Sequence, residues 1–148
     1  MDVVLFQPEI PQNTGNIVRT CSVTGCGLIL VRPLGFSISN RHLKRAGLDY
    51  WKEVQISFID DLTEFLENTC NSFYFFSSRA ERCYSDVDYQ MSDLLIFGSE
   101  TKGLPMIFRQ RWPDKFCKIP MKEESRCLNL ANAASIAIYE AWRKQGFR

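Results

Sequence analysis

The stretch DLLIFGSETKGLP, residues 93–105, determines the architecture that we expect for this chain. Its first half holds four consecutive apolar residues, which is typical of a strand buried on both faces of a parallel sheet. Gly98 and Gly103 then bracket a short polar segment. Glycines at the end of a buried strand permit a tight loop whose backbone N–H groups face a ligand. The same spacing also fits an ordinary turn between a strand and a helix, so both interpretations stay open at this point.

Other short apolar runs predict further strands, and helical patterns lie between them. The predicted strands cover residues 3–6, 28–33, 54–59, 72–78, 93–99 and 116–121, and the predicted helices cover residues 14–25, 40–47, 60–68, 104–110 and 129–145. Near-continuous apolar strands separated by helices indicate an α/β fold, with a mostly parallel sheet and helices on both faces. No linker or repeat divides the 148 residues, so we expect residues 1–148 to form a single domain.

Composition indicates a soluble cytoplasmic protein without a metal or a membrane partner. The six cysteines form no CxxC pair and His42 is the only histidine, so we expect reduced thiols, no zinc site and no disulfide scaffold. The first residues lack the basic segment and long apolar run of a signal peptide, and no run reaches the length of a membrane span. The formal net charge of +1 does not by itself indicate a nucleic-acid partner, but it does not exclude a local basic stripe on the surface.

Polar residues follow the predicted strands, where open α/β sheets hold their ligands. The segments are QPEIPQNTGN (7–16) after the first strand, SSRAERC (77–83) after the fourth, GSETKGLP (98–105) after the fifth and PMKEESRCLN (120–129) after the last. In the first segment, Asn13 or Thr14 is predicted to cap the following helix. Further along that helix, Arg19 is either a surface residue or a guanidinium aimed at a phosphate or a reacting hydroxyl.

Two further features suggest chemistry. The segment SNRHLKRAGLDYW (39–51) gathers cations beside aromatic residues, which suits phosphate contact and base stacking, or else forms an exposed basic helix face. Cys127 lies near a helix start and beside Arg126, and both would lower the pKa of its thiol. A cysteine nucleophile needs a base, however, and the only histidine lies in the distant basic segment. We therefore do not expect covalent catalysis.

Three motifs together resemble the SPOUT class of RNA 2′-O-ribose methyltransferases. They are PEIPQNTGNIVRTC (8–21), LLIFGSETKGLP (94–105) and IPMKEESRCLNLANAASIAIYEAWR (119–143), and RAGLDYW (45–51) makes the chain most similar to the TrmL type, which methylates the wobble nucleotide of tRNA, cytidine or uridine 34. The resemblance covers nearly the whole chain. It implies a C-terminal trefoil knot, S-adenosylmethionine as cofactor, a homodimer, and tRNA bound through its anticodon stem-loop.

The resemblance also implies roles for single residues. The catalytic residues would be Arg19, Asn13, Glu100 and Asn129; the cofactor would contact Phe76, Ser77, Gly98, Ile119, Met121, Cys127 and Leu128; the RNA would contact Arg19, Arg41, Lys44 and Arg45; and no metal would take part. Arg19 would orient and polarise the ribose hydroxyl. Asn13 and Asn129 would hold Arg19 or the ribose, and Glu100 would orient Arg19 or its own loop. Cys127 replaces a common serine, and we expect near-normal activity because the neighbouring contacts are plausibly made by the main chain.

Two alternatives compete with this enzyme. One is a non-catalytic RNA-binding or ribosome-assembly module on the same fold, and the other is methyl transfer to another RNA or to a protein. The joint presence of Asn13, Arg19, Glu100 and Asn129 favours an enzyme, because a pure binder needs basic residues but not this set. The helix predicted at 129–145 is apolar around most of its circumference, which leaves a surplus face for a second subunit.

Overall fold

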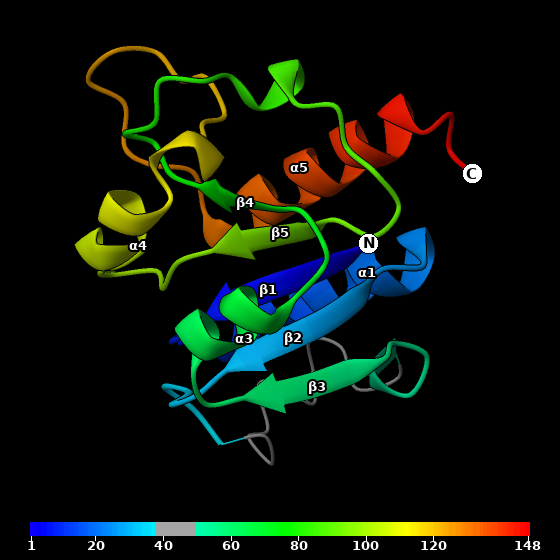
Figure 1. Cartoon of the computed structure of the whole chain (residues 1–148). Coiled ribbons are helices and arrows are strands. Elements are labelled where there is room, and N and C mark those ends of the chain that lie inside the picture. The colour runs from blue at the N-terminus through cyan, green and yellow to red at the C-terminus, as the bar shows by residue number, and fades with distance from the viewer. Residues whose placement is uncertain (38–49) are drawn as a thin grey trace.

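The computed structural model describes residues 1–37 and 50–148, and these form a parallel α/β sheet structure (Figure 1). Within the described residues the strands are β1 (Asp2–Phe6), β2 (Gly27–Val31), β3 (Ile56–Ile59), β4 (Phe73–Phe76), β5 (Leu94–Phe97) and β6 (Phe116–Cys117). They make one six-stranded sheet in the order β3-β2-β1-β5-β4-β6. Every neighbouring pair is parallel, so the carboxyl ends of all these strands meet at one edge.

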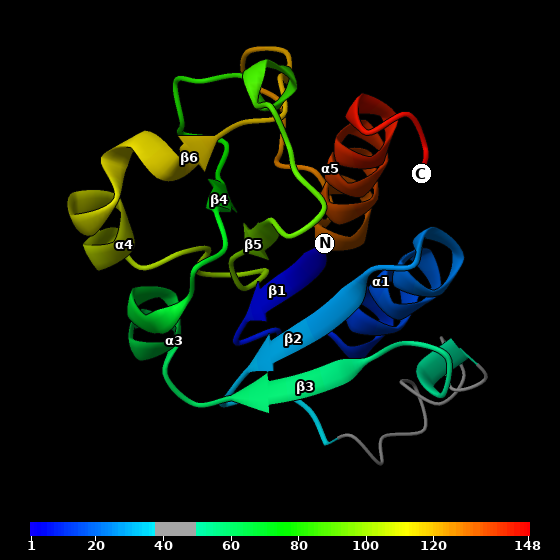
Figure 2. The same cartoon turned by 45° about the vertical axis from the view of Figure 1, so that its right-hand side comes forward.

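Helices cover both faces of the sheet, as Figure 2 shows. The described helices are α1 (Pro11–Thr24), α3 (Leu62–Asn68), α4 (Met106–Arg111) and α5 (Leu130–Lys144), with short 3-10 turns η1 (Tyr84–Asp86) and η2 (Pro113–Lys115). α1 and α5 lie side by side on one face, and α3 and α4 lie on the other. The predicted α/β class, with a mostly parallel sheet and helices on both faces, is confirmed. That residues 1–148 form one domain stays a prediction.

Side chains along the central strand β1 point alternately to the two faces of the sheet, so the core is divided into two layers. Val3 and Leu5 pack with Ile17 under α1 and α5, whereas Val4 packs with Phe75 on the face covered by α3 and α4. All five side chains have 0% exposure. Burying a side chain of this size contributes about 1.5–3 kcal/mol each relative to leaving it in water. The near-continuous apolar sequence of the strands is therefore explained by burial on both sides of the sheet.

The structure differs from the sequence predictions at several boundaries. β1 is one residue longer than predicted, the other strands are shorter, and β6 has two residues. The prediction that Asn13 or Thr14 caps the first helix is wrong, because α1 begins at Pro11 with Ile10 as its N-cap residue. Proline suits the first helical position, since its missing N–H would have no partner there. The predicted helix 40–47 lies outside the described residues, and no helix within them is long and apolar enough to cross a membrane.

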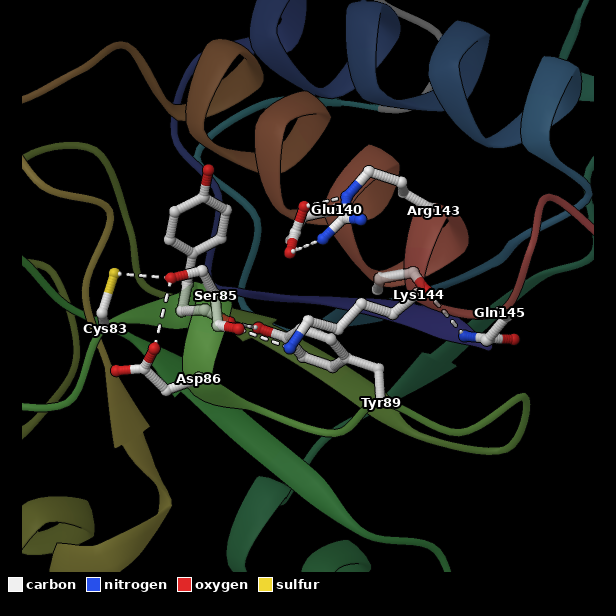
Figure 3. Close-up of polar contacts among 10 residues, drawn as sticks. Cys83, Ser85, Asp86, Tyr89, Glu140, Arg143, Lys144 and Gln145 are labelled. Atoms are coloured by element: carbon white, nitrogen blue, oxygen red, sulfur yellow. Dashed lines mark hydrogen bonds and ion pairs between the residues drawn. The ribbon is translucent and has the colours of Figure 1, made fainter.

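The segment between β4 and β5, residues 77–93, packs against the end of α5 (Figure 3). Tyr89 has 2% exposure, and its hydroxyl donates a hydrogen bond to the Tyr84 carbonyl oxygen at 2.8 Å. Burial raises the pKa of the Tyr89 phenol, so the group stays a protonated donor. The Lys144 ammonium on α5 donates to the Ser85 carbonyl oxygen. The Lys144 contact attaches the 77–93 segment to the C-terminal helix, whereas the Tyr89 hydrogen bond holds the segment to itself. The trefoil knot implied by the resemblance stays a prediction.

The buried phenol of Tyr89 gives a stability prediction. Tyr89→Phe removes the donor to the Tyr84 carbonyl, and we expect the free energy of unfolding to fall by about 1 kcal/mol, measured by urea denaturation. Tyr74→Phe is the matched control, because the Tyr74 ring packs beside Tyr89 with centroids 5.5 Å apart and its hydroxyl makes no hydrogen bond in the described part of the chain. Equal unfolding midpoints for the two variants would show that the buried hydrogen bond does not stabilise the fold.

Candidate functional site

A cavity of about 470 Å³ lies at the carboxyl edge of the sheet, where β4 and β5 end. Residues 76–79, 97–104 and 127–130 line it, together with Ile119 and Met121 after β6, Ile10 and Asn13 at the start of α1, and Ala133 on α5. A cavity of this size is within the range that holds small ligands and cofactors. All seven residues that the resemblance assigns to the cofactor, Phe76, Ser77, Gly98, Ile119, Met121, Cys127 and Leu128, line this one cavity. We call it the cofactor-type cavity, and the binding role of these residues stays a prediction.

One wall of the cofactor-type cavity is aromatic and apolar. The rings of Phe76 and Phe97 stack with their centroids 4.6 Å apart and their planes at 17°. Ile119 and Met121 add aliphatic and thioether surface, and Leu128 is 39% exposed at the edge. Such a surface suits a flat, weakly polar ring, which gains contact with apolar groups while its polar rim meets backbone groups.

The glycine-bracketed loop forms a second wall, and its shape depends on both glycines. Gly98 has no room for a side chain, because an added Cβ would lie 2.2 Å from the carbonyl carbon of Gly103. The loop closes on itself through the Gly103 N–H, which donates to the Ser99 carbonyl at 2.9 Å, and Gly103 itself has φ +67°. The close approach that requires a glycine at position 98 is therefore that of the chain's own backbone.

A chain of hydrogen bonds joins three segments at the border of the cofactor-type cavity. The Glu100 carboxylate accepts from the Glu9 N–H at 2.7 Å, from the Ile10 N–H at 3.1 Å and from Nδ2 of Asn13 at 3.0 Å. Nδ2 of Asn129 donates to Oδ1 of Asn13 at 2.8 Å. Oδ1 of Asn129 meanwhile caps α5 by accepting from the backbone N–H two residues on, at 2.9 Å. The loop after β1, the loop after β5 and the start of α5 are thereby held in one arrangement.

Glu9 reinforces the same junction from the opposite direction. Its carboxylate accepts from the backbone N–H of Thr101 at 3.1 Å and from the Thr101 hydroxyl. Each of the two loops therefore supplies a carboxylate that binds backbone N–H groups of the other. Charged acceptors make stronger hydrogen bonds than neutral ones, so this reciprocal pair fixes the relative position of the loops. Sequence reasoning did not find this role of Glu9, since the pairing is visible only once β1 and β5 are known to be neighbours.

Arg19 lies apart from this network. It is exposed on α1, and its guanidinium carbon lies 5.3 Å from the centre of the Tyr50 ring. It does not line the cofactor-type cavity, and the hydrogen bonds that Asn13, Glu100 and Asn129 make are with one another and with backbone groups. Glu100 thus holds its loop, the second of the two roles considered for it. The predicted RNA-contact residues Arg41, Lys44 and Arg45 lie outside the described residues.

The cysteines give little support to thiol chemistry. All six are free. Cys21, Cys26 and Cys117 are buried, and burial raises the pKa of each thiol, to about 12 for Cys117, so these groups stay protonated near neutral pH. Cys127 is exposed in the cofactor-type cavity, and its sulfur lies 3.6 Å from the Ser78 hydroxyl oxygen. In residues 1–37 and 50–148, no three His, Cys, Asp or Glu side chains are grouped so that they could hold a metal ion.

The fold and the cavity together are typical of α/β proteins that bind a small molecule beyond the carboxyl ends of parallel strands. The protein belongs to the SpoU rRNA methylase family, whose model matches residues 1–139. The resemblance to SPOUT-class RNA methyltransferases is therefore confirmed. A Listeria monocytogenes relative is 48% identical over 149 residues, which cover 98% of this chain and 88% of that protein. The tRNA (cytidine(34)-2′-O)-methyltransferase of Yersinia pestis is 42% identical and covers 99% of this chain and 95% of that enzyme.

Solved structures agree with this assignment. A structure described as giving insights into the 2-OH methylation of C/U34 on tRNA superposes with a TM-score of 0.92 at 44% identity, over 99% of this chain and 97% of that one. The SpoU methyltransferase AviRb from Streptomyces viridochromogenes, in complex with the cofactor AdoMet, superposes with a TM-score of 0.86 at 25% identity. The match covers 98% of this chain and 57% of AviRb, so AviRb contains further chain beyond the shared part.

The hydrogen-bonding of Glu100 gives a second stability prediction. Glu100→Gln replaces one accepting oxygen by an NH₂ group, which turns a donor toward the backbone N–H groups that the carboxylate now binds. We expect the free energy of unfolding to fall by about 1–3 kcal/mol in urea denaturation. Glu81→Gln makes the same chemical change on an exposed residue of the 77–93 segment and serves as the control. A loss no larger than that of the control would mean that Glu100 does not hold the two loops together.

Proposed function

We propose that this protein transfers a methyl group from S-adenosylmethionine to the ribose 2′-hydroxyl of the wobble nucleotide of tRNA, cytidine or uridine 34. The observation that carries the proposal is the cofactor-type cavity with the Asn13, Glu100 and Asn129 network at its border. The 42% identity to a tRNA (cytidine(34)-2′-O)-methyltransferase over nearly the full length supports the choice of substrate. Action on tRNA would also place the protein in the cytoplasm.

The residues of the cofactor-type cavity fit S-adenosylmethionine. The stacked Phe76 and Phe97 rings and the side chains of Ile119, Met121 and Leu128 form an apolar slot for a flat adenine, which backbone N–H and C=O groups would read at its edge. Bound there, S-adenosylmethionine would supply an activated methyl group on a sulfonium. The protein's own task is then to align a weakly acidic hydroxyl and to keep the loops that surround it in place.

Asn13, Glu100 and Asn129 are proposed to perform the positioning part of this task. Their side chains bond to one another and to backbone N–H groups, and they border the cavity without depending on a ligand for their own arrangement. A site whose polar groups are already fixed loses little entropy when substrate binds. In this role Asn13 and Asn129 hold the ribose, and Glu100 acts as a positioning residue through the loop after β1.

Arg19 is proposed to act across a subunit interface. It lies on the exposed side of α1, away from its own cavity, yet a group that orients the 2′-hydroxyl must reach that hydroxyl. Beside α1, helix α5 exposes Ile136 and Tyr139 at 36% and 46%, and α1 exposes Val23 at 58%. This apolar surface suits a homodimer, in which α1 of one subunit would bring Arg19 to the cavity of the other. Arg19 would orient and polarise the hydroxyl by donating hydrogen bonds, because a guanidinium offers five N–H donors and no acceptor.

The RNA itself would be held largely by cations. Arg19 and the sequence-predicted residues Arg41, Lys44 and Arg45 are proposed to contact phosphates of the anticodon stem-loop. A homodimer joins two such groups of cations on one RNA, which compensates for the net charge of only +1 per chain. A trefoil knot formed by the chain after β6 and the 77–93 segment belongs to the same proposal.

The proposed function is tested by incubating the protein with S-adenosylmethionine and unmodified bulk tRNA and then mapping 2′-O-methylation. We expect methylation at nucleotide 34. Arg19→Ala should lower turnover by roughly 10²–10³-fold, because a donor to the reacting group is lost, while calorimetric affinity for S-adenosylhomocysteine stays at the wild-type value. Methylation at another nucleotide would overturn the choice of substrate, and an active Arg19→Ala variant would remove Arg19 from the mechanism.

Action of Arg19 across the interface is checked in the same assay by co-expressing two inactive variants. Gly98→Ala is expected to close the cofactor-type cavity, because its Cβ would strike the Gly103 backbone. In a mixed dimer, the Arg19→Ala subunit keeps an intact cavity, and the Gly98→Ala subunit supplies Arg19. We expect co-expression to restore about a quarter of the wild-type activity, as random pairing of two subunits gives. No recovery would show that Arg19 does not act on the partner's cavity.

A further inference from the structure

We propose that a second cavity, on the other side of the 98–103 loop, receives the base of the nucleotide that is methylated. This inference rests on the proposed function and names the part of the site that selects the substrate. The cavity has a volume of about 370 Å³ and lies beyond the carboxyl ends of β1 and β2. Its lining includes Phe6, Gln7, Leu34, Lys102 and Pro105, and we call it the Gln7 cavity.

The Gln7 cavity borders the cofactor-type cavity directly. Ser99, Lys102 and Gly103 line both cavities, so one turn of chain separates them. A base is attached to its ribose, so a ribose at the edge of the first cavity places its base within reach of the second. Lys102 is exposed at the boundary, where its ammonium can contact the phosphate of a nucleotide that spans the two.

The walls of the Gln7 cavity are fixed before any ligand binds. Gly35 approaches the first loop so closely that an added Cβ would lie 2.8 Å from Cα of Glu9, and its N–H donates to the Pro8 carbonyl at 2.9 Å. The Gln7 N–H donates to the Val31 carbonyl at 3.1 Å. Gln7 also has φ +48°, a left-handed conformation that a non-glycine residue adopts only at an energetic cost. Residues held in such conformations cluster at ligand sites, because the surroundings direct their side chains.

The chemistry of the lining fits a pyrimidine base. Phe6, Leu34 and Pro105 offer apolar surface for the flat ring, and the carboxylate of Glu9 is engaged by Thr101 on the loop. The Gln7 amide keeps hydrogen-bonding capacity for a base. Its Nε2 donates to the Arg32 carbonyl at 3.5 Å, a long hydrogen bond, and its oxygen accepts no hydrogen bond from the described part of the chain.

A glutamine amide explains why either cytosine or uracil would be accepted. At the exocyclic position 4, where we place the contact with Gln7, cytosine carries an amino donor and uracil carries a carbonyl acceptor. An amide carries both a donor and an acceptor, so turning the Gln7 side chain amide by half a rotation matches one base or the other. A side chain that only accepts, such as a carboxylate, would match the amino group of cytosine and repel the carbonyl of uracil.

The test uses the full-length protein and two anticodon stem-loop RNAs that differ only by cytidine or uridine at the target position. For Gln7→Glu we expect the ratio of kcat/KM for the cytidine RNA to that for the uridine RNA to rise by about tenfold. Repulsion between the new carboxylate and phosphates affects both RNAs equally and cancels in the ratio. Gln90→Glu makes the same charge change just before β5, at the opposite edge of the sheet, and should leave the ratio at the wild-type value.

A binding measurement separates this inference from the proposed function. Fluorescence anisotropy with the same RNAs, in the presence of S-adenosylhomocysteine, should show the same shift in the ratio of Kd values for Gln7→Glu. It should also show that Lys102→Gln lowers the slope of log K against log salt by about one. An unchanged cytidine-to-uridine ratio for Gln7→Glu, in activity or in binding, overturns the Gln7 cavity while leaving methyl transfer intact. Wild-type protein that binds neither RNA overturns both.

Discussion

The carboxylate of Glu100 ties together the two segments on which the cofactor-type cavity depends. β1 and β5 are neighbours in the sheet, so the loops that leave them run side by side, and nothing in the sheet itself fixes how these loops pack. One side chain accepts three N–H groups from the first loop and the start of α1, and Glu9 returns the contact to Thr101. Asn13 in turn accepts a hydrogen bond from Asn129, which extends the network to the start of α5.

This hydrogen-bond network accounts for the polar residues at the N-terminal ends of α1 and α5. α1 begins with Pro11 and has no side-chain cap, because its N-cap residue is the apolar Ile10, and Asn13 in the first turn is engaged with Glu100 and Asn129. Asn129 does cap its helix, and it uses its oxygen for the cap and its nitrogen for the network. Polar residues at the front of an otherwise apolar helix therefore serve the cavity as well as the helix.

Much of the fold was predictable from the sequence, because burial on both faces of a sheet leaves nearly continuous apolar runs such as residues 94–97. Strand order was not predictable from these runs: β5 lies between β1 and β4, and only packing across the whole chain decides this. The seven residues assigned to the cofactor came from the family resemblance, with Phe76 and Ser77 lying outside its three motifs, and all seven line one cavity. The partners of Glu100 and the outward direction of Arg19 were missed. The outward direction of Arg19 follows from helical periodicity, but only once α1 is known to bury Ile17 and Val18.

The central claim is that the segments joined by the hydrogen bonds of Glu100, Asn13 and Asn129 border a site for S-adenosylmethionine. The most direct measurement is a calorimetric titration of S-adenosylhomocysteine into the wild-type protein and into Gly98→Ala. We expect one binding site per chain for the wild type, and no measurable binding for a Gly98→Ala variant whose circular dichroism shows the same helix and sheet content. Absence of binding to the wild type, or equal affinity for both proteins, would contradict it.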